Sequence, residues 1–278
     1  MVGREVFLNI TKPPMKRGEK RMEIQNISYI SETGRPVLQD VSFNLYAGEI
    51  LGIAGVEGNG QTELVEVLTG LKRSAGGQAF VKGKSVLDHT PREVRQQGVA
   101  HIPEDRLTNG VALKESIEEN LIVDRYFSAP YKKGMMLDYR LIENKGKELI
   151  KQFGILTPNG KLPVESLSGG NMQKVIVARE FSSNPFVLIA SQPTRGIDVG
   201  ATEFIREELV RLRTAGCAVL LVSADLSEVM SLSDRIVTLY EGKITGVFPD
   251  ASKVGEDELG LYMLGIKHQT NEEMEKFL

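Results

Sequence analysis

The sequence contains a single cysteine, Cys217, which excludes an internal disulfide framework and a zinc site built from cysteines. It has no apolar stretch approaching the ~18 residues that a membrane-spanning helix needs, and its first residues do not form a signal-peptide pattern. Basic residues are not in excess, because 34 Lys and Arg stand against 37 Asp and Glu. The net charge of −3 gives no global attraction to a phosphate backbone, and no local basic patch stands out. We therefore expect no nucleic-acid partner.

The length of 278 residues, with 41% hydrophobic residues, suits a globular protein of one or two domains with a sizeable core. Without a spanning segment, we expect the chain to be cytoplasmic or bound peripherally to a membrane-embedded partner. Residues 1–21 carry six basic and two acidic side chains and the pair Pro13-Pro14, which is typical of an extended arm or linker. Residues 266–278 are expected to form a C-terminal tail, frayed from residue 271.

Hydrophobic patterning predicts alternating strands and helices. Apolar and polar residues alternate over 22–27 and 37–45, which indicates a small antiparallel sheet with one exposed face. Uniformly apolar runs predict strands buried on both faces, at 50–54, 98–102, 186–190, 218–222 and 236–240. Helical spacing over 202–213 and 225–232 places helices between the later strands. The order predicts an α/β fold with a mostly parallel core sheet.

The pattern changes between about residues 106 and 173. Strand signals vanish there, and residues 116–123 and 138–153 have the periodicity of helices, separated by Pro130 and Pro158. This stretch predicts a helical insertion into the α/β core.

A glycine-rich turn follows the first buried strand. Residues 55–62 read Gly-Val-Glu-Gly-Asn-Gly-Gln-Thr and fit the phosphate-loop pattern G-x-x-x-x-G-K-[ST] at all but one position. Glycines let the backbone N–H groups turn inward around phosphates, and the following helix offers its positive end. Thr62 is placed to ligate Mg²⁺, but Gln61 stands where the pattern has lysine. An ordinary tight turn is the alternative interpretation of such a loop.

A second motif lies further along the chain. Residues 167–173 read Leu-Ser-Gly-Gly-Asn-Met-Gln and open a predicted helix, with Ser168 as N-cap and two glycines that leave the helix end accessible to an anion. Alone, Ser-Gly-Gly is more often an ordinary loop. A buried strand follows it, and then Gln-Pro-Thr-Arg-Gly-Ile-Asp at residues 192–198, an order that argues against a chance match.

Residues 22–265 resemble an ATP-binding-cassette nucleotide-binding domain, and more narrowly the second cassette of the tandem ATP-binding subunits of simple-sugar and nucleoside importers. The narrower resemblance is carried by three segments, at residues 55–64, 102–106 and 192–200. It implies a P-loop NTPase cassette with a mostly parallel core sheet, an antiparallel β subdomain and a helical subdomain at about 106–173. It also makes residues 1–21 similar to the linker that follows a first cassette.

The resemblance assigns roles to individual residues. Those expected to hold ATP are Tyr29, which matches the aromatic residue that stacks on adenine, and Glu57, Gly58, Asn59, Gly60, Gln61, Thr62 and Glu63. The signature expected to contact the partner cassette's ATP is Ser168, Gly169, Gly170 and Asn171. Asp198 matches the acid in the loop that faces the partner. Thr62 and Glu104 match residues near Mg²⁺, although Glu104 stands where glutamine is usual.

The chain departs from the family pattern at the positions that handle the γ-phosphate. Ser191 and Gln192 replace the Asp-Glu pair that precedes Pro-Thr, and Ala224 replaces the switch histidine. Losing the lysine at Gln61 removes charge-assisted hydrogen bonds of about 1.5–3 kcal/mol each, which weakens nucleotide binding on the order of tenfold to a hundredfold. Losing a general base costs ~10²–10⁴ in rate. We therefore predict weak or distorted binding of ATP and Mg²⁺ and no competent catalytic residue.

The intact signature predicts the opposite for a partner's site. In cassette dimers, each ATP lies between one phosphate loop and the other subunit's signature, so this chain is expected to complete the site of a partner cassette. The resemblance further implies transmembrane permease subunits, an upstream solute-binding protein and a position on the inner face of the cell membrane. Two alternatives stay open: an active ATPase that uses Glu57, Glu63 or Asp225 as substitute acids, and a scaffold that binds no nucleotide.

Overall fold

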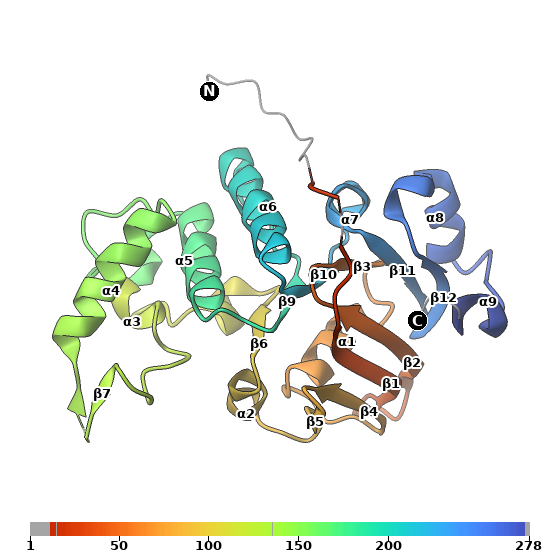
Figure 1. Ribbon diagram of the computed structural model, residues 1–278, viewed down its shortest axis with the longest axis horizontal. Coiled ribbons are helices and arrows are strands. Elements are labelled where there is room, and N and C mark those ends of the chain that lie inside the picture. Colours follow the sequence, from red (N-terminus) through yellow and green to blue (C-terminus); the bar gives the residue numbers. More distant parts are fainter. Residues whose placement is uncertain (1–11, 15, 135, 276–278) are drawn as a thin grey trace. The chain divides into compact units, whose positions relative to one another are not determined.

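The computed structural model describes residues 12–14, 16–134 and 136–275 (Figure 1). The chain divides into two compact units. The helical unit contains Ile102–Pro185 and Pro193–Arg206. The core unit contains the described residues of 12–101 together with 186–192 and 207–275.

A six-stranded sheet in the order β12-β11-β3-β10-β9-β6 forms the centre of the core unit. Its strands are β3 (Ile50–Ala54), β6 (Val99–Ile102), β9 (Val187–Ser191), β10 (Ala218–Val222), β11 (Arg235–Tyr240) and β12 (Lys243–Phe248). Strand β3 pairs in parallel with β10 and β11, and β9 pairs in parallel with β10, whereas β12 is antiparallel to β11. Every residue of β3, β9 and β10 is buried, as expected for apolar strands covered on both faces. The predicted α/β class is confirmed.

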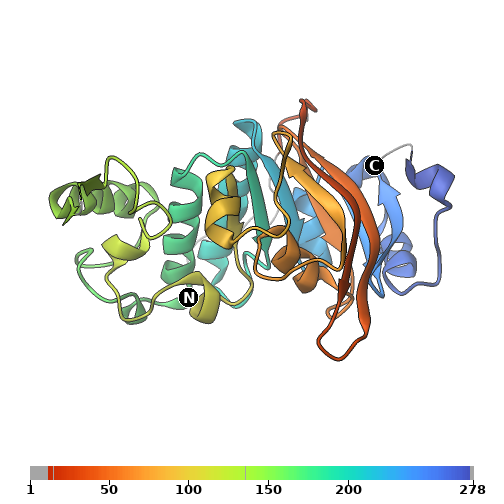
Figure 2. The same ribbon diagram turned by 90° about the horizontal axis from the view of Figure 1, so that it is seen from below.

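An antiparallel sheet in the order β2-β1-β4-β5 packs within the same unit. Its strands are β1 (Lys20–Ile30), β2 (Pro36–Tyr46), β4 (Gly76–Val81) and β5 (Lys84–Ser85). Figure 2 shows β1 and β2, in red-brown, running side by side as a long pair. Their inward residues, such as Ile24 and Phe43, share one hydrophobic cluster with Leu51 of β3, Leu64 of helix α1 (Gln61–Leu68) and Leu220 of β10. The predicted antiparallel sheet is confirmed.

A second hydrophobic cluster of the core unit joins α7 (Leu226–Leu232) and α8 (Glu256–Met263) to the ends of β3, β11 and β12. Helix α2 (Pro91–Gln96) begins at a capping box between Thr90 and Glu93. Helix α9 (Asn271–Glu275) follows residue Thr270, whose backbone N–H donates to Glu273 at 2.8 Å. The expectation of a frayed tail is therefore wrong for Asn271–Glu275, because Met274 packs against the larger hydrophobic cluster.

The helical unit contains α3 (Ile117–Asn120), α4 (Tyr139–Gln152), α5 (Gly169–Ser182) and the start of α6 (Val199–Thr214), which ends in the core unit. Polar N-caps begin these helices: Ser116 forms a capping box with Glu119, Asp138 caps α4 and Ser168 caps α5. A two-residue pair, β7 (Lys132–Lys133) and β8 (Met136–Leu137), forms a small hairpin that the sequence pattern did not predict. None of the described helices is long and apolar enough to cross a membrane.

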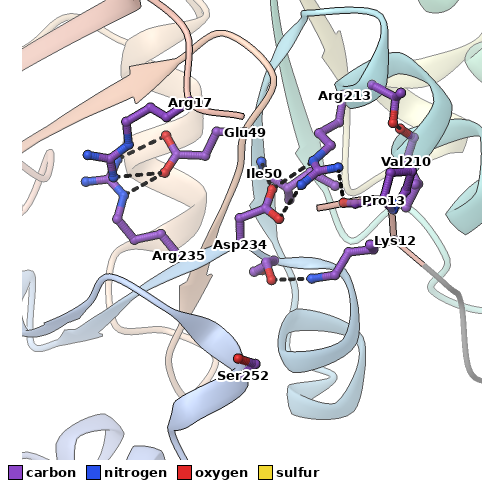
Figure 3. Close-up of polar contacts among 12 residues, drawn as sticks. Lys12, Pro13, Arg17, Glu49, Ile50, Val210, Arg213, Asp234, Arg235 and Ser252 are labelled. Atoms are coloured by element: carbon purple, nitrogen blue, oxygen red, sulfur yellow. Dashed lines mark hydrogen bonds and ion pairs between the residues drawn. The ribbon is translucent and has the colours of Figure 1, made fainter. Parts of the chain in front are cut away.

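The arm, which we define as described residues 12–19, has no helix or strand but is bound to the core unit (Figure 3). Arg213 Nη1 donates to the carbonyl oxygen of Pro13 at 2.9 Å, and Lys12 Nζ donates to the carbonyl oxygen of Ser233. Arg17 pairs with the buried Glu49 at 3.5 Å. Burial lowers the pKa of Lys12 from its ordinary value, which is a sign that the arm packs closely.

Candidate functional site

The phosphate loop joins the carboxyl end of β3 to helix α1 in the core unit. Gly58 and Gly60 have φ values of 92° and 104°, which side-chain-bearing residues rarely adopt. Gly60 is the N-cap of α1 and supplies no side-chain hydrogen bond to the first turn of the helix. A helix N-terminus behind a glycine turn favours an anion such as a phosphate.

Asn59 anchors this loop to the turn between β11 and β12. Its Nδ2 donates to the Val56 carbonyl at 3.1 Å, and its Oδ1 accepts the Glu241 N–H at 2.9 Å. The Gly242 N–H donates to the Asn59 carbonyl at 3.0 Å. Asn59 therefore shapes the loop from within and ties it to Glu241, a role that sequence spacing did not indicate because Glu241 lies 182 positions away.

Gln61 lies on the loop where the pattern has lysine. Its side chain is 7% exposed, and its Nε2 donates to the Val56 carbonyl at 3.0 Å, folding over the start of the loop. A Cβ at Gly55 would lie only 2.4 Å from this nitrogen, so Gly55 provides the space. The amide is neutral, so this position carries no charge for a phosphate group. Thr62, the next residue, is exposed on the first turn of α1.

Tyr29 lies near the end of β1, beside a cation from the segment after α1. Lys72 Nζ is 5.3 Å from the centroid of the Tyr29 ring and 2.7 Å from Glu66 Oε2. The hydrogen bond to Glu66 raises the pKa of Lys72 above its usual value. Glu63 lies in the first turn of α1 and is partly exposed. The core unit thus brings the predicted adenine-stacking residue and the loop helix together through Lys72.

The carboxyl ends of β9 and β10 carry the substituted positions. Ser191 is 2% exposed at the end of β9, and Gln192 follows with φ 47°, in the left-handed region. Gln192 donates its N–H to the Val222 carbonyl at 2.7 Å, and its Oε1 accepts the Ala224 N–H at 3.1 Å. The two residues predicted to replace the catalytic glutamate and the switch histidine are therefore hydrogen-bonded to each other.

Asp225, considered as a substitute acid, caps α7. Its Oδ1 accepts the Ser227 N–H at 3.0 Å, the Ser227 hydroxyl at 2.6 Å and the Glu228 N–H at 3.2 Å. An N-cap carboxylate of this kind is engaged in helix formation. The structure therefore gives no support to a catalytic role for Asp225.

The signature belongs to the helical unit. Ser168, exposed, is the N-cap of α5, and its Oγ accepts the Asn171 Nδ2 at 3.0 Å and the Asn171 N–H at 3.4 Å. The Asn171 Oδ1 in turn accepts the Leu156 N–H at 2.8 Å. Asn171 therefore orients the Ser168 hydroxyl while the N-terminus of α5 stays open at Gly169.

Asp198 packs directly on the signature within the same unit. A Cβ at Gly170 would lie 2.5 Å from Asp198 Oδ2 and 3.0 Å from the Cβ of Ala201, so only glycine allows this approach. Asp198 Oδ1 accepts the Ala201 N–H at 2.9 Å. The structure thus places the predicted partner-facing acid beside the predicted signature.

Glu104, expected near Mg²⁺, is paired with Arg195, whose Nη1 contacts its Oε1. Arg106 donates to the backbone of the same loop, at the carbonyls of Arg195 and Gly196. Arg106 and Arg195 lie within two motifs, at residues 102–106 and 192–198, and the sequence pattern predicted no role for either of them. A cation in each motif was the only sequence feature that pointed to this contact.

The residues fit a phosphate better than a magnesium ion. The loop leads into the N-terminus of α1, whose N–H groups and positive potential match phosphate oxygens. For Mg²⁺ the core unit offers the Thr62 hydroxyl, and the position at which the family resemblance leads one to expect an aspartate holds the buried Ser191. Across the part of the chain that the structure describes, no group of three or more His, Cys, Asp or Glu side chains could hold a metal ion.

The fold and this site define an ATP-binding cassette of the ABC transporter class. Residues 38–195 match the ABC transporter family profile, and the chain belongs to this family. It is 42% identical over 265 residues to the guanosine import ATP-binding protein NupO of Bacillus subtilis. The aligned region covers 95% of this chain and 52% of NupO. It is 38% identical over 265 residues to the nucleoside import ATP-binding protein NupA of Lactococcus lactis subsp. cremoris, with 95% and 52% covered.

Solved structures agree with the fold. A nucleotide-free ATP-binding cassette from an ABC transporter has a TM-score of 0.70 at 22% identity, covering 94% of this chain and 99% of that chain. An ABC transporter cassette in its ADP conformation also has a TM-score of 0.70, at 21% identity, covering 88% and 95%. The chain spans about half the length of the curated relatives that it matches.

Proposed function

We propose that this chain is the second ATP-binding cassette of an importer for nucleosides or simple sugars, with a hydrolysis-deficient site of its own and a signature that completes a partner's site. The relatives named for guanosine and nucleoside import, of which it matches about half, support the transport role. The resemblance of residues 192–200 to second cassettes supports the order within the subunit. The boundaries 22–265 for the cassette and 1–21 for the linker belong to the same proposal.

The hydrogen bond between Gln192 and Ala224 carries the proposal of deficient hydrolysis. A general base must accept a proton from the attacking water, and a neutral carboxamide cannot do so at any physiological pH. Its oxygen is already accepting the Ala224 N–H at 3.1 Å, and alanine has no imidazole to stabilise the transferred phosphoryl group. The two positions that would act on the γ-phosphate are therefore inactive and bound to each other.

ATP binding at this chain's own loop is proposed to persist, but weakly. The N-terminus of α1 behind the glycine loop remains, whereas Gln61 contributes a neutral amide in place of a lysine charge. Losing such charge-assisted hydrogen bonds, about 1.5–3 kcal/mol each, lowers affinity tenfold to a hundredfold. Mg²⁺ would be held by Thr62 without an acid at Ser191, so its coordination would be incomplete. Bound nucleotide then serves to join two cassettes.

The signature supports the complementary half of the proposal. Asn171 orients the Ser168 hydroxyl at 3.0 Å, and the N-terminus of α5 provides positive potential for the partner's γ-phosphate. The partner is the first cassette of the same subunit or another ATP-binding cassette. Transmembrane permease subunits would hold both cassettes on the inner face of the cell membrane, and a solute-binding protein would deliver the substrate to the permease. Leu107, Val123 and Tyr126, apolar side chains of the helical unit that are 50%, 45% and 42% exposed, suit contact with such a permease.

Two measurements of phosphate release test the proposal. The chain alone, with Mg²⁺ and ATP, should turn over far below ~1 per second, the lower end for competent kinases. Mixed with the first cassette of its subunit, Ser168→Ala should abolish the activity of the mixture, whereas Ser128→Ala, at an exposed serine of the same unit, should not. Rapid release by the chain alone would favour the active-ATPase alternative. Unchanged activity with Ser168→Ala would defeat the assignment of the signature, and calorimetry without any ATP binding at millimolar concentration would favour the scaffold.

A further inference from the structure

Two arginines of the helical unit meet the loop of residues 193–198, and they have separate partners. Arg195 pairs with Glu104, whereas Arg106 donates Nη1 to the Arg195 carbonyl at 2.7 Å and Nη2 to the Gly196 carbonyl at 3.0 Å. The backbone under Arg106 is fixed, because the Asp105 Oδ1 caps the two N–H groups that follow it. Arg106 is therefore directed at backbone oxygens while the nearby carboxylate of Glu104 is taken by Arg195.

The guanidinium also lies beside the signature. A Cβ at Gly169 would lie 3.2 Å from Arg106 Nη2 and 3.7 Å from the Gly196 carbonyl oxygen. Gly196 has φ 65°, a conformation that turns two consecutive carbonyls toward one guanidinium. Arg106 is thus hydrogen-bonded to the loop and lies next to the first residue of α5, where the absence of a side chain leaves room for it.

The same loop is fixed at its two ends by other contacts. Gln173, 3% exposed, donates Nε2 to the Pro193 carbonyl at 2.8 Å. Asp198 packs against Gly170, at 2.5 Å from the position of a Cβ there. Between these ends, the hydrogen bonds of Arg106 hold the middle of the loop beside Gly169.

We propose that Arg106 is a positioning residue for the partner's reaction: it holds residues 193–198 against the N-terminus of α5, so that Ser168 and Asp198 face the partner's nucleotide in one fixed arrangement. This inference rests on the proposed function, since it concerns the surface lent to a partner cassette. Arg106 acts through backbone carbonyls and is not itself a catalytic residue. Its effect is to keep the signature surface in shape before the two cassettes close.

Arginine is specifically suited to this position. Its planar fork presents two parallel N–H donors that match two neighbouring carbonyls, whereas the single ammonium of lysine cannot bridge them in the same geometry. Small misplacements of groups around a reacting centre can cost on the order of a hundredfold in rate. We therefore expect Arg106→Ala and Arg106→Lys to lower the turnover number of the partner's site by about tenfold to a hundredfold.

The experiment uses this chain mixed with the hydrolysis-competent first cassette. The turnover number and KM for ATP would be measured for the unmodified chain and for Arg106→Ala, Arg106→Lys, Ser168→Ala and Arg140→Ala. Arg140→Ala is the matched control, because Arg140 is an exposed arginine of α4 in the same unit. Thermal melting of each variant separates a loss of turnover from unfolding.

We expect a lower turnover number for both Arg106 variants. The KM for ATP should change little, because ATP first binds the partner's own loop. The melting temperature of both variants should stay close to that of Arg140→Ala. Full activity of Arg106→Lys would overturn the inference, because it would show that charge alone suffices. Full activity of Arg106→Ala would overturn it too. If either result came with a Ser168→Ala variant that is inactive, the proposed function would stand; an active Ser168→Ala variant would instead refute the proposed function itself. Should Arg106→Ala fail to fold, Arg106→Lys decides.

Discussion

Removing the carboxylate of Asp234 should destabilise the core unit more than any single surface change. Asp234 Oδ2 accepts from Arg213 Nε at 3.0 Å and from the Ile50 N–H at 2.9 Å, and its Oδ1 accepts from Arg213 Nη2 at 2.7 Å (Figure 3). The side chains of Arg213 and Asp234 are 2% and 7% exposed. Asp234→Ala would remove both carboxylate acceptors of the buried Arg213 guanidinium, which also donates to the Pro13 carbonyl. It would also remove the acceptor of the Ile50 N–H, the first of β3.

The magnitude follows from burial. Removing one partner of a buried ion pair costs about 3–5 kcal/mol, because the other charge stays in a medium of low polarity. Domains of ordinary stability have about 5–15 kcal/mol in total, so the loss would be a large part of it. Asp234→Asn should cost less, because its carboxamide oxygen can still accept the Ile50 N–H.

Urea unfolding followed by far-UV circular dichroism measures this cost, and a fluorescence signal must come from tyrosine because the chain has no tryptophan. The matched control is Glu208→Ala, which breaks the pair between Glu208 and Arg211 on α6, where the Arg211 side chain is 56% exposed. Exposed pairs contribute ~0–1 kcal/mol. If Asp234→Ala cost no more than Glu208→Ala, at equal m-values, the reasoning from burial would be refuted.

Two further predictions concern protonation. Burial raises the pKa of the Cys217 thiol to about 12, so at pH 8 only about one folded molecule in 10⁴ would carry the reactive thiolate. Ellman's reagent should therefore label Cys217 slowly in buffer and rapidly in urea. Fast labelling of the native protein would contradict this prediction. Burial and the charge of Glu143 raise the pKa of Glu118 above 4.5, so the folded state binds the proton more tightly and stability falls as pH rises through the interval above 4.5. Glu118→Gln removes the buried charge and should melt at a higher temperature than the unmodified chain at pH 7, with equal melting at pH 4; a lower melting temperature at pH 7 would count against this account.

The sequence pattern predicted those strands, turns and helix starts that depend on residues close together in the chain. The apolar runs at 50–54 and 218–222 became buried strands, and the phosphate loop lies between β3 and α1 as its glycines require. Ser168, predicted as an N-cap, caps α5, whereas Asp225, considered only as a substitute acid, caps α7. These features depend on neighbours within a few positions in the chain.

Contacts between distant segments were not predictable in the same way. The hydrogen bond between Gln192 and Ala224 exists because β9 and β10 are adjacent parallel strands, which composition alone does not determine. Arg106 reaches a carbonyl 89 residues away, and Arg213 reaches one 200 residues away. The sequence shows that these polar side chains are present, but it does not show which atoms they bind. Their partners follow from the order of the strands and the packing of α5.

The attachment of the arm has a mechanical consequence. Its contacts with Ser233 and Glu49 lie just before the amino-terminal ends of β11 and β3, its contact with Arg213 lies at the carboxyl end of α6, and β3 carries the phosphate loop at its other end. Five residues of strand, about 16 Å at ~3.3 Å per residue, separate the two. Tension applied through the arm would therefore load a stiff, fully hydrogen-bonded strand at its base, and the nucleotide loop would experience that load along the strand axis.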